Sequence, residues 1–499
     1  MNIWLVTTGS SDVQLKAKEN WTKLFRDARN QVDGRGFTPT EGTESRFLVP
    51  GRVMGIVYSQ PQAAQYFDDL VFPLLDNFVN QIEGKLLDKI ILILSNQDSV
   101  FTLSERRSQH HPYWQDTCTL QPILEKYLKS RFPHPDIHPL FLQPTSSSEG
   151  LDDWNSVFNL VQCKFSALEL PDDVTVYVSH QAGTPAISSA VQFASLAKFG
   201  DRVKFLVSNE HNPTLTGFVE SSSYLRGIKL QQAKQLLDRH DYSGVQALIK
   251  TDNDTRVLLD AAIQWNFAKF DEFANTVQQS SDQELAQEVK ERSQHWWWIA
   301  YEETYLAIIR KDQGNIVEAF FHSFRAFEGI FAAWGKDEFK EHIEIQKGVP
   351  YLSISVLTAP KDYFSQSQCK KSSDLKKLRS NIEAEARVEL NLATLCKLFR
   401  SCRREYKQEC EELKIFWDSD KEKNVSEKRN FIMHQVQGMS KEDLWKFWEV
   451  STSKDWEERM QKFLNFIAKE DLPKEFKPLE EASLMVKVHR ELGSAIAQL

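Results

Sequence analysis

Hydrophobic residues follow different patterns in the two halves of the chain. In the first half, short continuous apolar runs alternate with longer stretches in which apolar residues recur every three or four positions. The apolar runs lie at about 2–7, 89–94, 139–142, 174–178 and 203–207, and the helical stretches at about 61–82, 114–130, 154–166 and 185–199. Continuous apolar runs are typical of parallel strands buried on both faces. Their alternation with helices predicts right-handed crossovers and an α/β, Rossmann-like domain with a parallel sheet.

From about residue 229 onward, we expect helices and no further strands. Helical patterns run through roughly 229–240, 254–270, 282–312, 315–335, 391–417, 422–437, 440–468 and 479–499, with an irregular stretch at 336–375. An aromatic stripe that includes Phe324 and Phe327 predicts a helix face turned toward a core. Arg325 and Glu328 lie three positions apart in the same helix, and this spacing predicts an ion pair between them.

These patterns predict a chain of several parts, as expected for 499 residues. We expect an α/β domain over 1–228, a helical connector over 229–290 and an all-α bundle over 291–499. Residues 31–60, which are rich in glycine and proline, are predicted to be an insertion or long loop. Such a loop could cover a ligand or contact a partner chain, or it could simply be solvated.

Polar residues follow the predicted strands at the points where ligands bind in parallel sheets, outside the carboxyl ends. The candidate binding residues are Thr8, Gly9, Ser10, Ser11, Asn96, Ser179, His180, Gly183 and Thr184. Gly9 and Gly183 would let the backbone approach a ligand closely. Pro185 suits the first turn of a helix whose N–H groups would face an anion. A phosphate-bearing ligand fits this edge, although turn geometry alone also explains small polar residues there. Neither loop has the GxGxxG or P-loop pattern needed for NAD binding or ATP hydrolysis.

A second group of candidate residues lies in the helical pattern at 422–437. Asn430 and His434 are four positions apart and share a helix face, and Arg429 flanks that face. An imidazole held by an amide beside a guanidinium suits RNA cleavage without a metal. The imidazole can move a proton to or from an oxygen, and the guanidinium can stabilise charge on the phosphate. A structural or solvated helix face is the alternative reading of Arg429, Asn430 and His434.

Composition narrows the class of protein further. The net charge of −9 argues against a protein that coats nucleic acid with its whole surface, but it allows a local basic cleft. No apolar run approaches the ~18 residues of a membrane span. The six cysteines lack CxxC spacing, which predicts reduced thiols in a cytoplasmic protein without a zinc site. The first residues lack a basic segment and are predicted to form a strand, not a signal peptide.

Both groups of candidate residues resemble known families. Leu5-Val6-Thr7-Thr8-Gly9-Ser10-Ser11 and Val178-Ser179-His180-Gln181-Ala182-Gly183-Thr184-Pro185 resemble the loops of a CARF domain, a Rossmann-fold sensor of CRISPR systems. Arg429-Asn430-x-x-x-His434 resembles the motif of HEPN ribonucleases. The order of CARF domain, helical connector and HEPN domain resembles that of ancillary ribonucleases of type III CRISPR systems, and it covers nearly the whole chain.

The resemblance implies a homodimer whose two CARF domains enclose a cyclic oligoadenylate activator. Cyclic tetra-adenylate is expected from its frequency in the family, and cyclic hexa-adenylate is the alternative. The HEPN domains would cleave single-stranded RNA without metal or cofactor, giving 2′,3′-cyclic phosphate and 5′-hydroxyl ends. His434 would be the acid or base, Arg429 would hold the phosphate and Asn430 would position His434. The CARF residues named above would contact the activator, and the domain could also degrade it through Ser10, Ser11 or His180.

Other classes of protein are less well supported by the sequence. A non-catalytic nucleotide-sensing scaffold would not need the complete Arg-Asn-x-x-x-His set. A toxin-like HEPN ribonuclease under protein control would not need a large α/β half. We find no basic recognition helix of a transcription factor, so stable DNA binding is not expected, and no membrane association is expected either.

Overall fold

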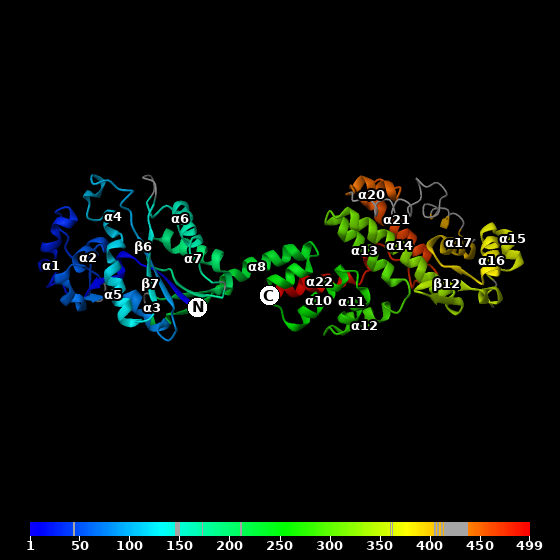
Figure 1. Cartoon of the computed structure of the whole chain (residues 1–499), viewed down its shortest axis with the longest axis horizontal. Coiled ribbons are helices and arrows are strands. Elements are labelled where there is room, and N and C mark those ends of the chain that lie inside the picture. Colours follow the sequence, from blue (N-terminus) through cyan, green and yellow to red (C-terminus); the bar gives the residue numbers. More distant parts are fainter. Residues whose placement is uncertain are drawn as a thin grey trace. The chain divides into compact units, whose positions relative to one another are not determined.

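The structure is a computed structural model that describes residues 1–42, 45–144, 150–171, 173–209, 212–359, 361, 363–403, 406, 409–410, 413 and 438–499. These residues belong to two units, an N-terminal unit, Met1–Gly227, and a C-terminal unit, Ile228–Leu499. Figure 1 shows strands concentrated in the first unit and helices in the second. Within the described ranges, no helix combines the length and the apolar character that crossing a membrane requires.

The N-terminal unit is built on a six-stranded sheet with the order β10-β9-β8-β1-β6-β7. Its strands are β1 (Asn2–Thr7), β6 (Lys89–Ser95), β7 (Asp136–Leu142), β8 (Thr175–Ser179), β9 (Val203–Val207) and β10 (Gly217–Glu220). All pairs are parallel except the edge pair of β9 and β10. The first five strands confirm the predicted runs, and β10 is an addition. Val6 pairs with both Leu92 and Ser179, so the carboxyl ends of β1, β6 and β8 meet at one edge.

Helices cover both faces of this sheet, as Figure 1 shows for α2 and α5 on one side and α6 and α7 on the other. The helices of the unit are α1 (Trp21–Ala28), α2 (Gly51–Tyr58), α3 (Pro73–Ile82), α4 (Pro112–Gln115), α5 (Gln121–Arg131), α6 (Trp154–Ser166) and α7 (Pro185–Phe199). Successive residues of β6 enter different cores, because side chains alternate across a strand. Leu92 packs with the first group of helices, and Ile91 and Ile93 pack with α6 and α7.

The segment 31–60 differs from the prediction of a long loop. It contains β3 (Thr40–Glu41), β4 (Phe47–Leu48) and the buried helix α2, and β3 and β4 join β2 (Gln14–Leu15) and β5 (Leu70–Val71) in a second small sheet. Val53, Met54 and Val57 are fully buried. Gly55 is required for close packing, since a Cβ there would lie 2.3 Å from the carbonyl carbon of Thr119. Gly55 therefore permits close helix packing and does not mark a loop.

The C-terminal unit is mostly helical and has one continuous hydrophobic core. Its helices are α8 (Ser221–Asp238), α9 (Tyr242–Leu248), α10 (Asn253–Asn266), α11 (Phe270–Val277), α12 (Gln283–Arg292), α13 (Trp298–Asp312), α14 (Ile316–Glu338), α15 (Gln366–Lys371), α16 (Ser373–Glu385), α17 (Leu392–Cys402), α20 (Lys441–Phe447), α21 (Ser453–Ile467) and α22 (Met485–Gln498). Residues of 229–290 share this core with α13, α14, α21 and α22. The role of 229–290 as a connector stays a prediction.

The C-terminal unit also contains a small sheet that the sequence did not predict. Its antiparallel strands are β11 (Ile343–Gln346), β12 (Val349–Ser353) and β13 (Arg387–Glu389). Lys347 and Gly348 connect the first two strands, both with positive φ (51° and 82°), as a two-residue hairpin turn needs. Three of the four residues of β11 are exposed, so its hydrophobic pattern is too short and too polar to predict a strand.

Candidate functional site

A pocket of about 740 Å³ lies at the carboxyl ends of β1, β6 and β8 in the N-terminal unit. Six of the nine predicted binding residues line it: Thr8, Gly9, Ser10, Ser11, Gly183 and Thr184. The structure also brings residues to the lining that the sequence did not single out, among them Asp12, Gln97, Gln115, Asp116 and Gln181. The expectation that ligands bind at the carboxyl ends of strands thus located the pocket. Its opposite wall is formed by residues from the segments 37–50 and 109–117.

Two glycines bring the loops after β1 and β8 into contact. A Cβ on Gly9 would lie 3.0 Å from the backbone nitrogen of Gly183, and Gly183 has a φ of +92°. Thr184 then begins α7, where its Oγ1 accepts a hydrogen bond from Ile187 N (3.2 Å) and donates one to Leu151 O (2.6 Å). Because the start of this 15-residue helix lies at the pocket, the helix dipole favours an anion there.

The hydroxyl groups of Thr8, Ser10 and Ser11 differ in the hydrogen bonds that they already make within the protein. Ser10 Oγ donates to Gln115 Oε1 (2.7 Å) and accepts from Gly51 N (2.6 Å), so it joins three segments of the pocket wall. Thr8 is buried, and its Oγ1 bonds to Ile93 O (3.0 Å). Ser11 is exposed, and its hydroxyl has no hydrogen-bond partner among the described residues. Ser11 therefore offers the most available hydroxyl of the three to a ligand.

Asn96, Ser179 and His180 are not part of the pocket lining. Ser179 is fully buried and accepts a hydrogen bond from Trp4 Nε1 (3.0 Å). His180 lies edge-on to the ring of Phe205, and its Nδ1 is 3.1 Å from Ser188 Oγ. Burial lowers the pKa of His180, which keeps the imidazole neutral at pH 7. The structure thus gives Ser179 and His180 packing roles beneath the pocket, and their predicted contact with an activator stays a prediction.

Asp12 is an acidic residue of the pocket that the sequence analysis missed. It is almost completely buried, and its carboxylate accepts a hydrogen bond from Gly9 N (2.9 Å). Burial raises the pKa of Asp12 to about 7, against the lowering effect of the Gly9 bond. A large fraction of Asp12 is therefore neutral near pH 7, which weakens its repulsion of a bound phosphate. Its position directly after Ser10 and Ser11 is the sequence feature that could have suggested it.

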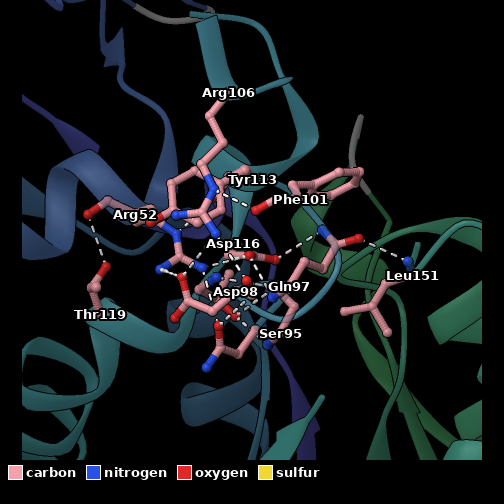
Figure 2. A network of polar contacts seen from close by, with 12 residues as sticks. Arg52, Ser95, Gln97, Asp98, Phe101, Arg106, Tyr113, Asp116, Thr119 and Leu151 are labelled. Carbon is pink, nitrogen blue, oxygen red and sulfur yellow. Dashed lines mark hydrogen bonds and ion pairs between the residues drawn. The ribbon is translucent and has the colours of Figure 1, made fainter. Parts of the chain in front are cut away.

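A buried arginine, Arg52, bonds to a residue that lines the pocket, and Figure 2 shows the network of polar contacts around it. Arg52, from α2, has one Nη 2.6 Å from Asp116 Oδ2 and the other 3.3 Å from Asp98 Oδ1. Its Nε donates to Tyr113 O (2.8 Å), and a third Nη contact reaches Asn96 Oδ1 at 3.2 Å. The guanidinium also lies 3.9 Å from the centre of the Tyr113 ring. All three nitrogens of Arg52 are therefore used within the protein.

This network continues across the pocket through Gln97. Gln97 donates from its backbone N (2.8 Å) and from Nε2 (3.0 Å) to the two carboxylate oxygens of Asp116. Its Oε1 accepts from Leu151 N (2.8 Å), and Leu151 O accepts from Thr184 (2.6 Å). Figure 2 shows the part from Arg52 to Leu151. A continuous series of hydrogen bonds therefore joins α2 to the first residue before α7.

The second predicted site lies outside the described residues. Arg429, Asn430 and His434 belong to 414–437, so their predicted roles stay predictions. Within the ranges that the structure describes, no group of three or more His, Cys, Asp or Glu side chains is placed to hold a metal ion.

Comparison with known proteins gives a result at the level of fold. No protein-family model matches the chain. No curated protein sequence matches it. Among solved structures, the chain is similar to "Enterococcus italicus Csm6 bound to cyclic hexa-2'-fluoro-hexa-dAMP", with a TM-score of 0.56 and 12% identity over 99% of this chain and 100% of that one. This likeness in fold confirms the predicted fold class at the level of architecture: an α/β, Rossmann-like unit with a parallel sheet, followed by a helical unit.

Proposed function

We propose that this chain is an endoribonuclease of type III CRISPR antiviral defence that cleaves single-stranded RNA when a cyclic oligoadenylate binds its N-terminal unit. The observation that carries the proposal is the likeness in fold, over 99% of the chain, to a Csm6 structure that holds a cyclic six-nucleotide adenylate analogue. The pocket of about 740 Å³ supports the proposal for two reasons. The pocket lies at the carboxyl ends of the parallel strands, where such sheets bind ligands, and the start of α7 there favours a phosphate.

The activator would be bound by two copies of the chain around a two-fold axis. A ring of identical nucleotides can have two-fold symmetry, which matches the symmetry of a homodimer. Gly9 and Gly183 line the pocket without side chains that would fill it, and the Ser11 hydroxyl, which no described residue bonds, would contact a phosphate. The six-nucleotide ligand of the similar structure favours cyclic hexa-adenylate, and cyclic tetra-adenylate is the other candidate.

The RNA would be cleaved without a metal by the residues of the HEPN motif. The ribose 2′-oxygen attacks the neighbouring phosphorus as the bond to the 5′-oxygen breaks. His434 would take the proton from the 2′-hydroxyl or give one to the 5′-oxygen, and Asn430 would position its ring. Arg429 would stabilise the charge on the phosphate. The products would be a 2′,3′-cyclic phosphate and a 5′-hydroxyl.

The test is cleavage of a fluorescent single-stranded RNA in EDTA by the wild-type chain and by His434→Ala. Each is assayed with no ring, with cyclic tetra-adenylate and with cyclic hexa-adenylate. We expect cleavage only with one of the two rings, and none by His434→Ala. Ring binding without cleavage would support the alternative of a non-catalytic scaffold. Equal cleavage with and without a ring would support a toxin-like ribonuclease under protein control.

The N-terminal unit could also limit the response by degrading its activator. Ser11 is better placed for this than Ser10 or His180, because Ser10 is held by Gln115 and Gly51, and His180 lies outside the pocket lining. The test is incubation of full-length His434→Ala with cyclic hexa-adenylate, followed by chromatography. A linear product would support this activity, and an intact ring after long incubation would remove it.

A further inference from the structure

A buried carboxylate on α13 lies beside an arginine and a histidine of α14. Glu303 is 4% exposed, and its Oε1 lies 2.8 Å from His322 Nδ1 and 3.3 Å from Arg325 Nε. The sequence predicted that Arg325 would pair with Glu328, but the structure pairs it with Glu303 from the neighbouring helix. His322 and Arg325 lie three positions apart on α14 and so share one face of it.

Both side chains keep nitrogen atoms that no other described residue bonds. The Arg325 side chain is 57% exposed, and its two terminal amino groups have no partner among the described residues. His322 bonds through Nδ1, and its Nε2 likewise has no partner in the part of the chain that the structure describes. Three nitrogens on one helix face are therefore available to a ligand.

Holding the two helices together does not explain this arrangement. α13 and α14 already pack through an apolar core that includes Leu306, Phe320 and Phe327. Arg310 and Glu318 form a further ion pair between them at 3.0 Å. Burying a carboxylate is unfavourable unless it is well paired, and a surface pair contributes little to stability. A buried carboxylate that fixes the orientation of an exposed guanidinium is instead typical of a preorganised binding site.

We propose that Arg325 and His322 bind a backbone phosphate of single-stranded RNA, with Glu303 as the positioning residue. The inference rests on the proposed ribonuclease function. With Nε bound to Glu303, the two terminal amino groups of Arg325 present the planar fork that binds two phosphate oxygens. When the His322 imidazole is protonated, its Nε2 adds a third donor on the same side of α14. The subsite binds substrate by its backbone, so it does not select a base sequence.

The test is fluorescence anisotropy of the full-length chain with a single-stranded RNA that carries 2′-fluoro groups and so lacks the attacking hydroxyl. Binding is measured with saturating cyclic hexa-adenylate, and again with cyclic tetra-adenylate, over a series of salt concentrations. We expect Arg325→Ala to weaken binding about tenfold, as for loss of a charge-assisted contact. We also expect the slope of log affinity against log salt to fall by about 0.7, since one phosphate contact to a single strand is lost.

A matched control is Arg131→Ala, which removes the same charge from a guanidinium bound to Glu83 in the N-terminal unit. We expect unchanged affinity and an unchanged salt slope for this variant. Arg325→Lys should keep the salt slope and recover only part of the affinity, because it retains the charge but loses the fork. Glu303→Gln should weaken RNA binding while the salt slope stays at its wild-type value.

Two results would overturn the subsite while leaving the ribonuclease function in place. One is wild-type RNA binding and cleavage with an unchanged affinity and salt slope in Arg325→Ala. The other is a change of oligomeric state in Arg325→Ala on sedimentation without any change in RNA affinity, which would make this face an interface between copies. Absence of RNA binding and cleavage by the wild-type chain with either ring would overturn both proposals together.

Discussion

Arg52 in the N-terminal unit and Arg325 in the C-terminal unit are both paired with a nearly buried carboxylate. They differ in how many guanidinium nitrogen atoms remain available to a ligand. All three nitrogens of Arg52 are engaged by Asp116, Asp98, Asn96 and Tyr113. Among the described residues, Arg325 contacts a carboxylate only through Nε, which lies 3.3 Å from Glu303 Oε1, and most of its side chain is exposed. Arg52 can therefore shape a pocket without touching its ligand, whereas Arg325 has donors to offer to a ligand.

The largest effect should come from removing the arginine whose donors are all used. Arg52→Ala leaves Asp116 buried without its cation, and breaking a buried pair in this way costs about 3–5 kcal/mol. We expect the unfolding free energy of the N-terminal unit to fall by that amount in urea denaturation, with loss of ring binding. Arg325→Ala should lower stability by less, about 1 kcal/mol, because Glu303 keeps its 2.8 Å contact with His322 and most of the Arg325 side chain is exposed. Equal losses in the two variants would remove the distinction between them.

Two neighbouring glutamates on α13 allow a similar comparison between a carboxylate that stabilises the fold and one that positions a ligand-binding side chain. Glu302 is fully buried and accepts hydrogen bonds from Trp265 Nε1 (2.8 Å), Ser483 Oγ (2.7 Å) and Leu484 N (2.5 Å). An amide at this position cannot accept from all three, so Glu302→Gln should lower the unfolding free energy by about 2 kcal/mol. Its RNA affinity should stay at the wild-type value.

Glu303→Gln should show the opposite pattern, with a smaller loss of stability and a clear loss of RNA affinity. Both variants are measured by urea denaturation and by anisotropy with the same 2′-fluoro RNA. A loss of RNA affinity in Glu302→Gln as large as that in Glu303→Gln would mean that these measurements report general damage to α13. In that case the position of Arg325 would not be the cause.

How far the sequence predicts such features depends on whether they are local. The strands at 2–7 and 203–207 were predicted to the residue, because each is a short run dominated by apolar and β-branched residues. Thr8, Gly9, Gly183 and Thr184 were predicted to bind ligand from their place after strands, and they line the pocket. Ser179 does not, because it is still the last residue of β8 and meets Trp4.

The arginine clusters could not be predicted in this way. Arg52 meets Asp116 across 64 residues, and Glu303 meets His322 from the preceding helix. No periodicity along the chain encodes either contact. The local rule for Arg325 even suggested a different partner, Glu328, since i and i+3 residues share a helix face. Tertiary packing decided which carboxylate was buried and therefore which pair formed.

Two buried groups, one in each unit, should contribute to the acid response with opposite signs. Burial raises the pKa of Asp12 to about 7, so the folded N-terminal unit binds more protons than the unfolded chain between about pH 4 and 7, and its stability falls as pH rises. Burial and His489 lower the pKa of His240 to about 4. The unfolded chain therefore binds more protons between about pH 4 and 6.5, and the stability of the C-terminal unit rises with pH.

These slopes are measured by urea denaturation between pH 4 and 7 for the wild-type chain, Asp12→Asn and His240→Asn. One proton accounts for at most about 1.4 kcal/mol per pH unit. Asparagine suits both sites, because it resembles the neutral acid at 12 and tolerates the positive φ of 57° at 240. Each substitution should remove the contribution of its own group and leave the slope of the other unit unchanged. A slope that survives in Asp12→Asn would assign the acid response of the N-terminal unit to another group.

The smallest effects on stability should come from replacing residues that cap helices. Comparing a cap at the pocket with a cap far from it separates a loss of stability from a loss of ring binding. Thr184 caps α7 at the pocket, and Asp252 caps α10 in the C-terminal unit with its Oδ1 2.8 Å from Thr255 N. Thr184→Ala and Asp252→Ala should each lower stability by about 1 kcal/mol. Only Thr184→Ala should also weaken ring binding, because Thr184 additionally holds Leu151 through its 2.6 Å bond and lines the pocket.

Thr184→Ser is the control for this pair, since a serine hydroxyl can make both bonds of the threonine and should restore ring affinity. Ring binding is measured by titration calorimetry with each cyclic oligoadenylate, and stability by urea denaturation of the same samples. If Thr184→Ala lost stability but bound the ring as tightly as the wild type, the start of α7 would be a structural cap alone. The anion would then have to be bound by the first loop, where Ser11 holds the free hydroxyl.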